Sequence, residues 1–230
     1  MWDKGNDWVQ RVTEMHRETV ARWHEMPVDN PYDGLLGIAC QQHQFNFLLW
    51  HEEDVARSPN VSDQRIAEVK RQIDKYNQQR NDWIEKIDVA ILEALAEEGV
   101  TPTETVPLNT ETPGSATDRL SIMSLRIFHM DEQLQRDDAD EAHKQGVQVK
   151  LARARGGARA GAAGLVEGLQ GGFHCLDLPS RAAHHFGRNF RMHIPGINAQ
   201  AETLNLTSLP LVQRRAKLQP KSRASYAGLT

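Results

Sequence analysis

The sequence has little cysteine, few aromatic residues and no long apolar run. Cys40 and Cys175 are the only cysteines among 230 residues and form no C-x-x-C pair, so we expect neither a disulfide framework nor a cysteine-based zinc site. No apolar segment approaches the roughly 20 residues that cross a bilayer. The first residues are acidic and are not followed by an apolar stretch, unlike a secretory signal. We therefore expect a cytoplasmic protein that does not enter a membrane.

Common catalytic signatures are also missing. The chain has no Walker loop, no G-x-S-x-G turn and no H-E-x-x-H helix. The glycines at residues 156–161 follow no strand pattern, so they do not form a dinucleotide fingerprint. The motifs therefore leave open whether the protein is an enzyme.

The net charge and the glycine content of the chain both change near residue 148. Residues 1–147 carry 15 basic and 28 acidic side chains, a net −13, whereas residues 148–230 carry 12 and 3, a net +9. All five tryptophans precede this division and 10 of the 16 glycines follow it. This separation predicts a helical bundle domain at residues 1–151 and an irregular or poorly ordered Gly/Ala/Arg-rich tail at residues 152–230.

Apolar residues recur at three- and four-residue steps in five segments before that tail. Ser62 can cap the third and longest segment, which should end at Gly99. A capping box from Ser115 to Asp118 should open the fourth. The pattern indicates an all-α fold, an antiparallel bundle of four to five helices with a long central helix. The expected helices cover about residues 7–25, 31–57, 62–98, 115–134 and 138–151.

Several long motifs are specific enough to compare with a family. They are Arg22-Trp23-His24 with Asn30-Pro31-Tyr32, residues 42–54, residues 77–88, and residues 108–121 with His129-Met130. Over about residues 6–151 they resemble the bacterial family named domain of unknown function 4254. The resemblance implies a helical fold, a bacterial source and a cytoplasmic location. It implies no activity, although an association with polysaccharide genes hints at sugar or nucleotide-sugar metabolism. Beyond Lys150 the chain departs from the family pattern, which either a frameshift near residue 152 or a diverged tail would explain.

The second expected helix carries a polar face that could form a pocket in the bundle. Within it, His51 could act as a general base or metal ligand beside Glu52 or Asp54. The alternative is that its histidines are hydrogen-bonded to neighbouring helices and only stabilise the fold. The polar residues that share this face are His43, Asn46, His51 and Asp54.

A polar patch also interrupts the apolar stripe of the third expected helix. Arg80 suits a phosphate or carboxylate, because its planar guanidinium binds two oxygens at once. Glu85 and Asp88 lie about one turn apart and could share a divalent metal ion. Solvated charges or pairs between helices would explain the same spacing. The residues of this patch are Asn77, Arg80, Asn81, Glu85 and Asp88.

Charged residues of the fourth expected helix and of the predicted tail could make further contacts. Arg119 could add positive charge to an anion at the start of that helix, where capping by Ser115 and Asp118 is the competing explanation. The basic C-terminal residues have almost no aromatic neighbours, so we expect neither nucleic acid nor a membrane as a partner. A homo-oligomer is compatible with the sequence.

Two functions of different class follow. In the first, the bundle binds or processes a phosphorylated or sugar-nucleotide ligand, with a divalent metal as an optional cofactor, and its polar side chains converge on a pocket open to solvent. In the second, the protein is a non-catalytic interaction module, and the same side chains are buried and paired with one another.

Overall fold

A computed structural model describes residues 4–99 and 111–171. The regular secondary structure of these residues is entirely helical, as the sequence predicts. No helix in the described part of the chain is both long and apolar enough to cross a membrane. The helices are α1 (Lys4–Glu25), α2 (Gly34–Ala56), α3 (Asp63–Glu97), α4 (Pro113–Leu134) and α5 (Glu141–Gly171).

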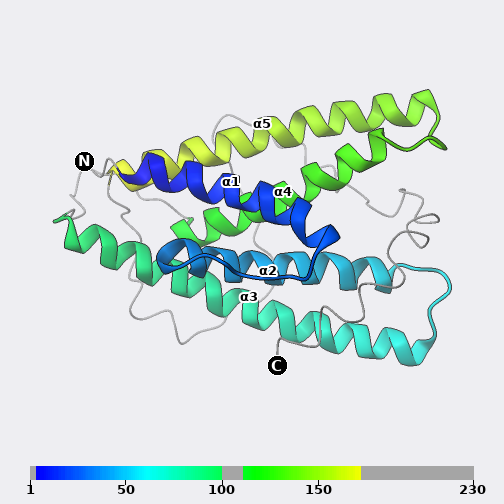
Figure 1. Cartoon of the computed structure of the whole chain (residues 1–230), viewed down its shortest axis with the longest axis horizontal. Helices are drawn as coiled ribbons and strands as arrows, with labels where there is room; N and C mark the ends of the chain where they lie inside the picture. Colours follow the sequence, from blue (N-terminus) through cyan, green and yellow to red (C-terminus); the bar gives the residue numbers. More distant parts are fainter. Residues whose placement is uncertain (1–3, 100–110, 172–230) are drawn as a thin grey trace.

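The directions of the helices determine which residues meet. α2 and α3 form one antiparallel hairpin and α4 and α5 another, each with an extensive contact between its two helices (Figure 1). α1, α2 and α4, in contrast, run in the same direction, because residues 26–33 return the chain along the bundle before α2 begins (Figure 1). The antiparallel arrangement expected from the sequence therefore describes the hairpins, whereas three helices are mutually parallel.

The three parallel helices share one register. Residues on α2 contact residues 27 positions earlier on α1, as in His16 with His43 and His24 with His51. They contact residues 78 positions later on α4, as in His43 with Ser121. This register produces two polar layers, which lie eight residues apart, or about 12 Å along a helix. Between them lies an apolar layer of Val20, Phe47 and Leu125, each 1% exposed.

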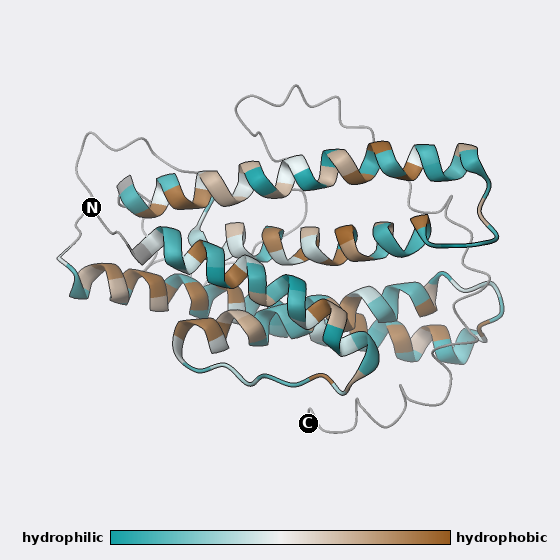
Figure 2. Ribbon diagram, turned by 45° about the horizontal axis from the view of Figure 1, so that its top comes forward, coloured by the Kyte–Doolittle hydropathy of each residue, from teal (hydrophilic) through white to brown (hydrophobic). Residues whose placement is uncertain are grey.

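The core is built around α2. Residues from Gly37 to Leu49 are buried on most sides of this helix, whereas the longer α3 keeps much of its outer surface exposed. Polar and apolar bands alternate along the helices in Figure 2, as expected for amphipathic helices that bury one face. The apolar core combines α1 and α2 with residues of α3, α4 and α5.

The sequence predicts some helix ends correctly and others wrongly. Ser62 caps α3 by accepting a hydrogen bond from the Arg65 N–H, and Gly99 has a φ of +70° just beyond its end, as expected. The predicted start of α2 at Pro31 is wrong, because the helix begins at Gly34. Asn30 instead donates a side-chain hydrogen bond to the carbonyl oxygen of Gly37, which holds the linker against the first turn of α2.

The predicted end of the last helix at Leu151 is also wrong, since α5 continues to Gly171. The glycines of this segment each cost about 1 kcal/mol in a helix, but packing compensates for them. Ala154, Leu165 and Leu169 are buried, and Gly157 lies against the Met123 side chain of α4. Part of the predicted irregular tail is therefore helical and packed, and residues 172–230 lie outside the described part of the chain.

Candidate functional site

Three histidines from the parallel helices converge near the C-terminal ends of those helices. His24 of α1, His51 of α2 and His129 of α4 each place one ring nitrogen within 4.8 Å of a ring nitrogen of the other two. Among the described residues, this histidine trio is the one cluster of three or more metal-ligand side chains. His24 and His51 are partly buried and His129 is buried, so the trio lies at the edge of the core.

Each ring of the histidine trio is oriented by a hydrogen bond at its Nδ1. Because carbonyl and carboxylate oxygens only accept hydrogen bonds, Nδ1 must carry the hydrogen in each contact. A neutral ring then keeps the lone pair on Nε2, the form that binds metals. The three contacts are His24 Nδ1 to the Val20 oxygen at 2.6 Å, His51 Nδ1 to the Phe47 oxygen at 2.7 Å, and His129 Nδ1 to Glu132 Oε2 at 2.7 Å.

Aromatic rings cover the faces of the trio. They restrict ring rotation and lower the local polarity, both of which favour a defined metal site. Phe128 stacks on His24 with ring centroids 4.4 Å apart, Trp50 stacks on His129 at 4.9 Å, and Phe47 lies tilted over His51 at 4.3 Å.

The donor set fits a transition-metal ion of the zinc type. A tetrahedral ion with metal–nitrogen bonds of about 2.1 Å needs about 3.4 Å between the ligand nitrogens, so the rings would close by at most about 1.4 Å from the observed spacing. Three histidines leave a fourth position for water or a ligand, which is the arrangement of catalytic rather than structural zinc. Glu132 behind His129 completes a carboxylate–histidine pair.

The second polar layer lies eight residues earlier on the same helices and is more deeply buried. His43 Nδ1 is 2.6 Å from Ser121 Oγ, and the ring centroids of His16 and His43 are 4.5 Å apart. Burial lowers the pKa of His16 to about 3 and that of His43 well below its usual value. Both rings are therefore neutral. Ser121 stands where a third histidine would be needed, so this layer lacks a third strong nitrogen ligand.

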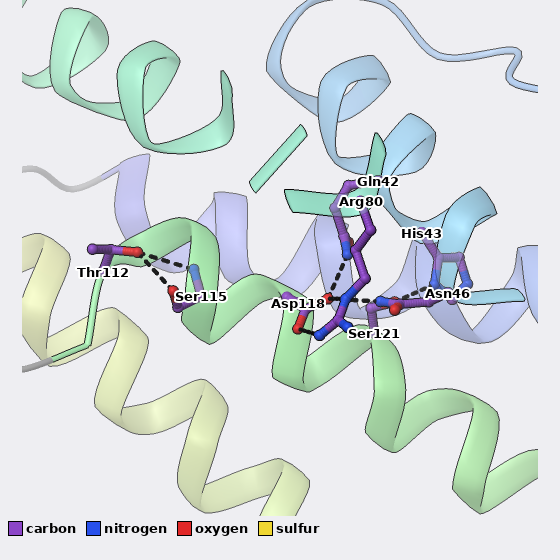
Figure 3. A network of polar contacts seen from close by, with 8 residues as sticks. All are labelled: Gln42, His43, Asn46, Arg80, Thr112, Ser115, Asp118 and Ser121. Carbon is purple, nitrogen blue, oxygen red and sulfur yellow. Dashed lines mark hydrogen bonds and ion pairs between the residues drawn. The ribbon is translucent and has the colours of Figure 1, made fainter. Parts of the chain in front are cut away.

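A buried network around Asp118 connects α2, α3 and α4 (Figure 3). Arg80 binds both carboxylate oxygens, with Nε 2.7 Å from Oδ1 and Nη2 2.5 Å from Oδ2. Gln42 Nε2 and Asn46 Nδ2 donate to Oδ1 at 2.6 and 2.9 Å, and Asn46 also donates to Ser121 Oγ. The guanidinium predicted to bind a phosphate or carboxylate of a ligand is thus paired with a carboxylate of the protein itself.

This network corrects the predicted capping box. α4 begins at Pro113 rather than Ser115, and its cap is Thr112, whose hydroxyl accepts a hydrogen bond from the Ser115 N–H. Asp118 is 6% exposed and faces the core. The capping box pattern fitted the spacing but not the direction of the side chain, because three donors from other helices bind Asp118 instead.

Asp88 of α3 stabilises the same end of α4 from outside that helix. Its Oδ1 accepts a hydrogen bond from the Gly114 N–H at 2.6 Å. Asp88 is 4% exposed, and burial raises its pKa to about 6. A Cβ on Gly114 would collide with the carbonyl oxygen of Ile84 and contact the Asp88 carboxylate. Glycine is therefore needed where α4 crosses α3.

The remaining predicted site residues are dispersed. Glu52 points toward α3, where its Oε2 is 3.9 Å from Arg65 Nη2, and burial raises its pKa. Arg119 pairs with Glu111 at 2.6 Å. Of the predicted metal pair, Asp88 is engaged by Gly114 while Glu85 is exposed. The others are placed as follows: Asp54 is 3.8 Å from Arg57, Asn77 is partly buried, and Asn81 is exposed.

The sequence predicts His51 as a general base or metal ligand but does not connect it with His24 and His129. His24 was noted only within a family motif, and His129 was assigned no role. A signal was present, because each member of the trio directly follows an aromatic residue. Only four aromatic–histidine pairs occur in the chain, and the fourth, at residues 173–174, lies outside the described part. Glu132 and His16 carried no such signal.

The chain was compared with protein families, curated proteins and solved structures. The family model described as "Protein of unknown function (DUF4254)" matches residues 37–160. No curated protein and no solved structure matches. The matched segment contains most of α2, all of α3 and α4 and more than half of α5, and it passes the position at which the sequence suggested a frameshift. The match covers more than half of the chain, which therefore belongs to the DUF4254 family.

Proposed function

We propose that the protein binds a divalent transition-metal ion through His24, His51 and His129 and uses the open coordination position of that ion for hydrolytic chemistry. The convergence of one ring nitrogen from each histidine within 4.8 Å of the other two, with each Nδ1 also bound to an oxygen, is the observation that supports it. A zinc-type ion bound by three histidines lowers the pKa of its bound water to about 7. The bound ion would thus supply the nucleophile for hydrolysis at an electrophilic carbon or phosphorus atom, with the leaving group taking up a proton from solvent.

The phosphorylated or sugar-nucleotide ligand expected from the sequence remains a prediction. Arg80 and Arg119, the guanidinium groups assigned to it, each bind a carboxylate of the protein. A ligand that used either group would have to displace that carboxylate, at an energetic cost. The histidine trio therefore supports a function better than the polar patch of α3.

A second candidate function has its own observation. The Asp118 network is buried and its members are paired with one another, as expected if it only fixes how α2, α3 and α4 pack. A non-catalytic interaction module would need only this packing role from the network. The two candidates differ in whether the histidine trio binds metal.

Metal binding by the full chain tests the proposal. Protein stripped with a chelator is titrated with Zn²⁺, and with Co²⁺ as a spectroscopic substitute, and metal content is measured after dialysis. We expect one ion per chain. An ion present at 100 times its dissociation constant should stabilise the fold by about 2.7 kcal/mol. Binding at no more than the level of an unrelated protein would refute the proposal.

Matched variants identify the ligands. His24→Gln, His51→Gln and His129→Gln should each abolish stoichiometric binding while circular dichroism shows the helices intact. His143→Gln is the control, because His143 lies on α5 outside the trio. If a trio variant unfolds, the Co²⁺ absorption spectrum of the unmodified protein still reports whether nitrogen ligands surround the ion. Equal metal binding by all four variants would contradict the assignment.

A further inference from the structure

The second polar layer contains three ring nitrogen atoms that bind nothing on the described helices. Both ring nitrogens of His16 and Nε2 of His43 are buried and have no hydrogen-bond partner there. The two residues are 1% and 0% exposed, so bulk water does not reach them. A buried donor or acceptor without a partner destabilises the folded state, and such atoms in folded proteins nearly always have one.

The Ser121 hydroxyl determines where the His43 ring carries its hydrogen (Figure 3). Ser121 Oγ accepts a hydrogen bond from Asn46 Nδ2 at 2.7 Å and lies 2.6 Å from His43 Nδ1. In the described part of the chain, His43 Nδ1 is the acceptor available to the hydroxyl hydrogen, so this nitrogen is bare and Nε2 carries the hydrogen. The backbone of His16 lies beside the His43 ring, but no hydrogen bond joins it to Nε2.

His16 needs a partner for each of its nitrogens. A neutral imidazole has one N–H group and one bare nitrogen. The centroids of the His16 and His43 rings are 4.5 Å apart, with the ring planes tilted by 41°. Two hydrogen bonds of about 2.9 Å to one oxygen atom join nitrogens roughly 4 to 5.5 Å apart, a span that rings at this separation can provide.

We infer that an internal water molecule binds between His16 and His43, accepting a hydrogen bond from the His43 N–H and donating one to the bare nitrogen of His16. The ligand must accept and donate at once and must be small, because the Trp23 ring also contacts His43, at 5.1 Å. It must be uncharged, because both rings are neutral and buried. Water meets these requirements, and buried waters characteristically bind polar groups that have no other partner.

This water would attach α1 to the Asp118 network. His43 is already connected to Asp118 through Ser121 and Asn46, so the water would extend the chain of hydrogen bonds to His16. The polar layer would then join α1 as well as α2, α3 and α4. The inference is independent of the metal proposed at the histidine trio, which lies eight residues farther along the helices.

A high-resolution crystal structure of the full chain provides the first test. We expect density for one oxygen atom within about 3.2 Å of both His43 Nε2 and a ring nitrogen of His16. A layer without such density, or a direct hydrogen bond between the two rings, would overturn the inference.

A matched pair of variants tests the same site in solution. His16→Gln and His16→Met introduce side chains of similar size, of which glutamine alone offers strong hydrogen-bonding groups to the water. Urea unfolding measures both, and we expect their unfolding equilibrium constants to agree within about threefold. In a dry layer the buried amide would lack a partner, and His16→Gln should unfold at least about tenfold more readily than His16→Met, which would contradict the inference. If either variant does not fold, the crystal structure of the unmodified protein decides.

Discussion

Arg80 and Asp118 form a two-pronged ion pair between α3 and α4, with Nε and Nη2 of the guanidinium each on a different carboxylate oxygen. The Asp118 side chain is 9% exposed and that of Arg80 24%. Burial makes the pair expensive to break from one side, because the remaining charge loses its partner without regaining water. The pair thus locks the position of α4, and with it His129.

Asp118→Ala is expected to destabilise the fold by about 3–5 kcal/mol, the usual cost of leaving a buried charge unpaired. Arg80, Gln42 and Asn46 would all lose an acceptor. Urea unfolding monitored by circular dichroism measures the change. Arg155→Ala, which removes the more exposed pair with Asp131, is the control and should cost less than about 1 kcal/mol. Similar losses from the two variants would mean that Asp118 does not organise the interface.

Asp88 should make stability depend on pH. Because its pKa is raised from 3.8 to about 6 in the folded chain, the folded state holds a proton that the unfolded state has released between these values. The stabilisation is therefore complete below about pH 4 and is lost as pH rises through 6, a change on the order of 3 kcal/mol.

Asp88→Asn isolates this contribution. The amide oxygen can still accept the Gly114 hydrogen bond but does not titrate, so the stability of the variant relative to the natural protein should increase from about pH 4 to pH 7. Unfolding in urea at several pH values gives the difference directly. A difference that decreased with pH would mean that the ionised carboxylate is favoured at the start of α4.

Gly114→Ala should destabilise the protein by about 1–3 kcal/mol or more, because the added methyl group has no space where α4 crosses α3. Gly164→Ala on α5 is the matched control. Nothing lies within 4 Å of its added Cβ, and alanine favours a helix by about 1 kcal/mol over glycine. The melting temperatures should move in opposite directions. A stabilising effect at Gly114 would contradict the close contact.

Glu132→Gln should weaken metal binding by about 10- to 100-fold, because the carboxylate that holds His129 Nδ1 becomes a neutral amide. Glu14→Gln changes an exposed glutamate on α1 and should leave the affinity unchanged. Competition with a chromogenic chelator measures both dissociation constants. An unchanged affinity in Glu132→Gln would show that the carboxylate does not support the ligand.

The sequence predicted the helices more successfully than their directions. Apolar spacing marks a helix locally, and Ser62 and Gly99 identified the ends of α3 correctly. The segment from 152 to 171 was missed because its glycines lower helix propensity, whereas burial of residues such as Leu165 favours the helix. The start of α2 was missed because Asn30 caps no helix and binds Gly37 instead.

The aromatic–histidine pairs mark the three histidines in the sequence, but that the three rings meet could not be predicted, for a geometric reason. In an antiparallel pair of helices, two residues that lie eight positions apart on one helix contact two residues of the other helix in the reverse sequence order. Here residues 26–33 return the chain, so His16 and His24 meet His43 and His51 in the same order. The order depends on the linker path, which side-chain periodicity does not encode.

Because the three helices share one register, the trio depends on the rotational position of each histidine around its helix axis but not on the length of the linkers. Packing between α1 and α2 aligns His24 with His51, so adding residues between 26 and 33 would leave the two rings facing one another. One residue inserted inside α1 before His24 would instead turn that ring by about 100° around the helix axis. Relatives could therefore vary widely in their loops and keep the site, while a single insertion ahead of the histidine within any of the three parallel helices would remove a ligand.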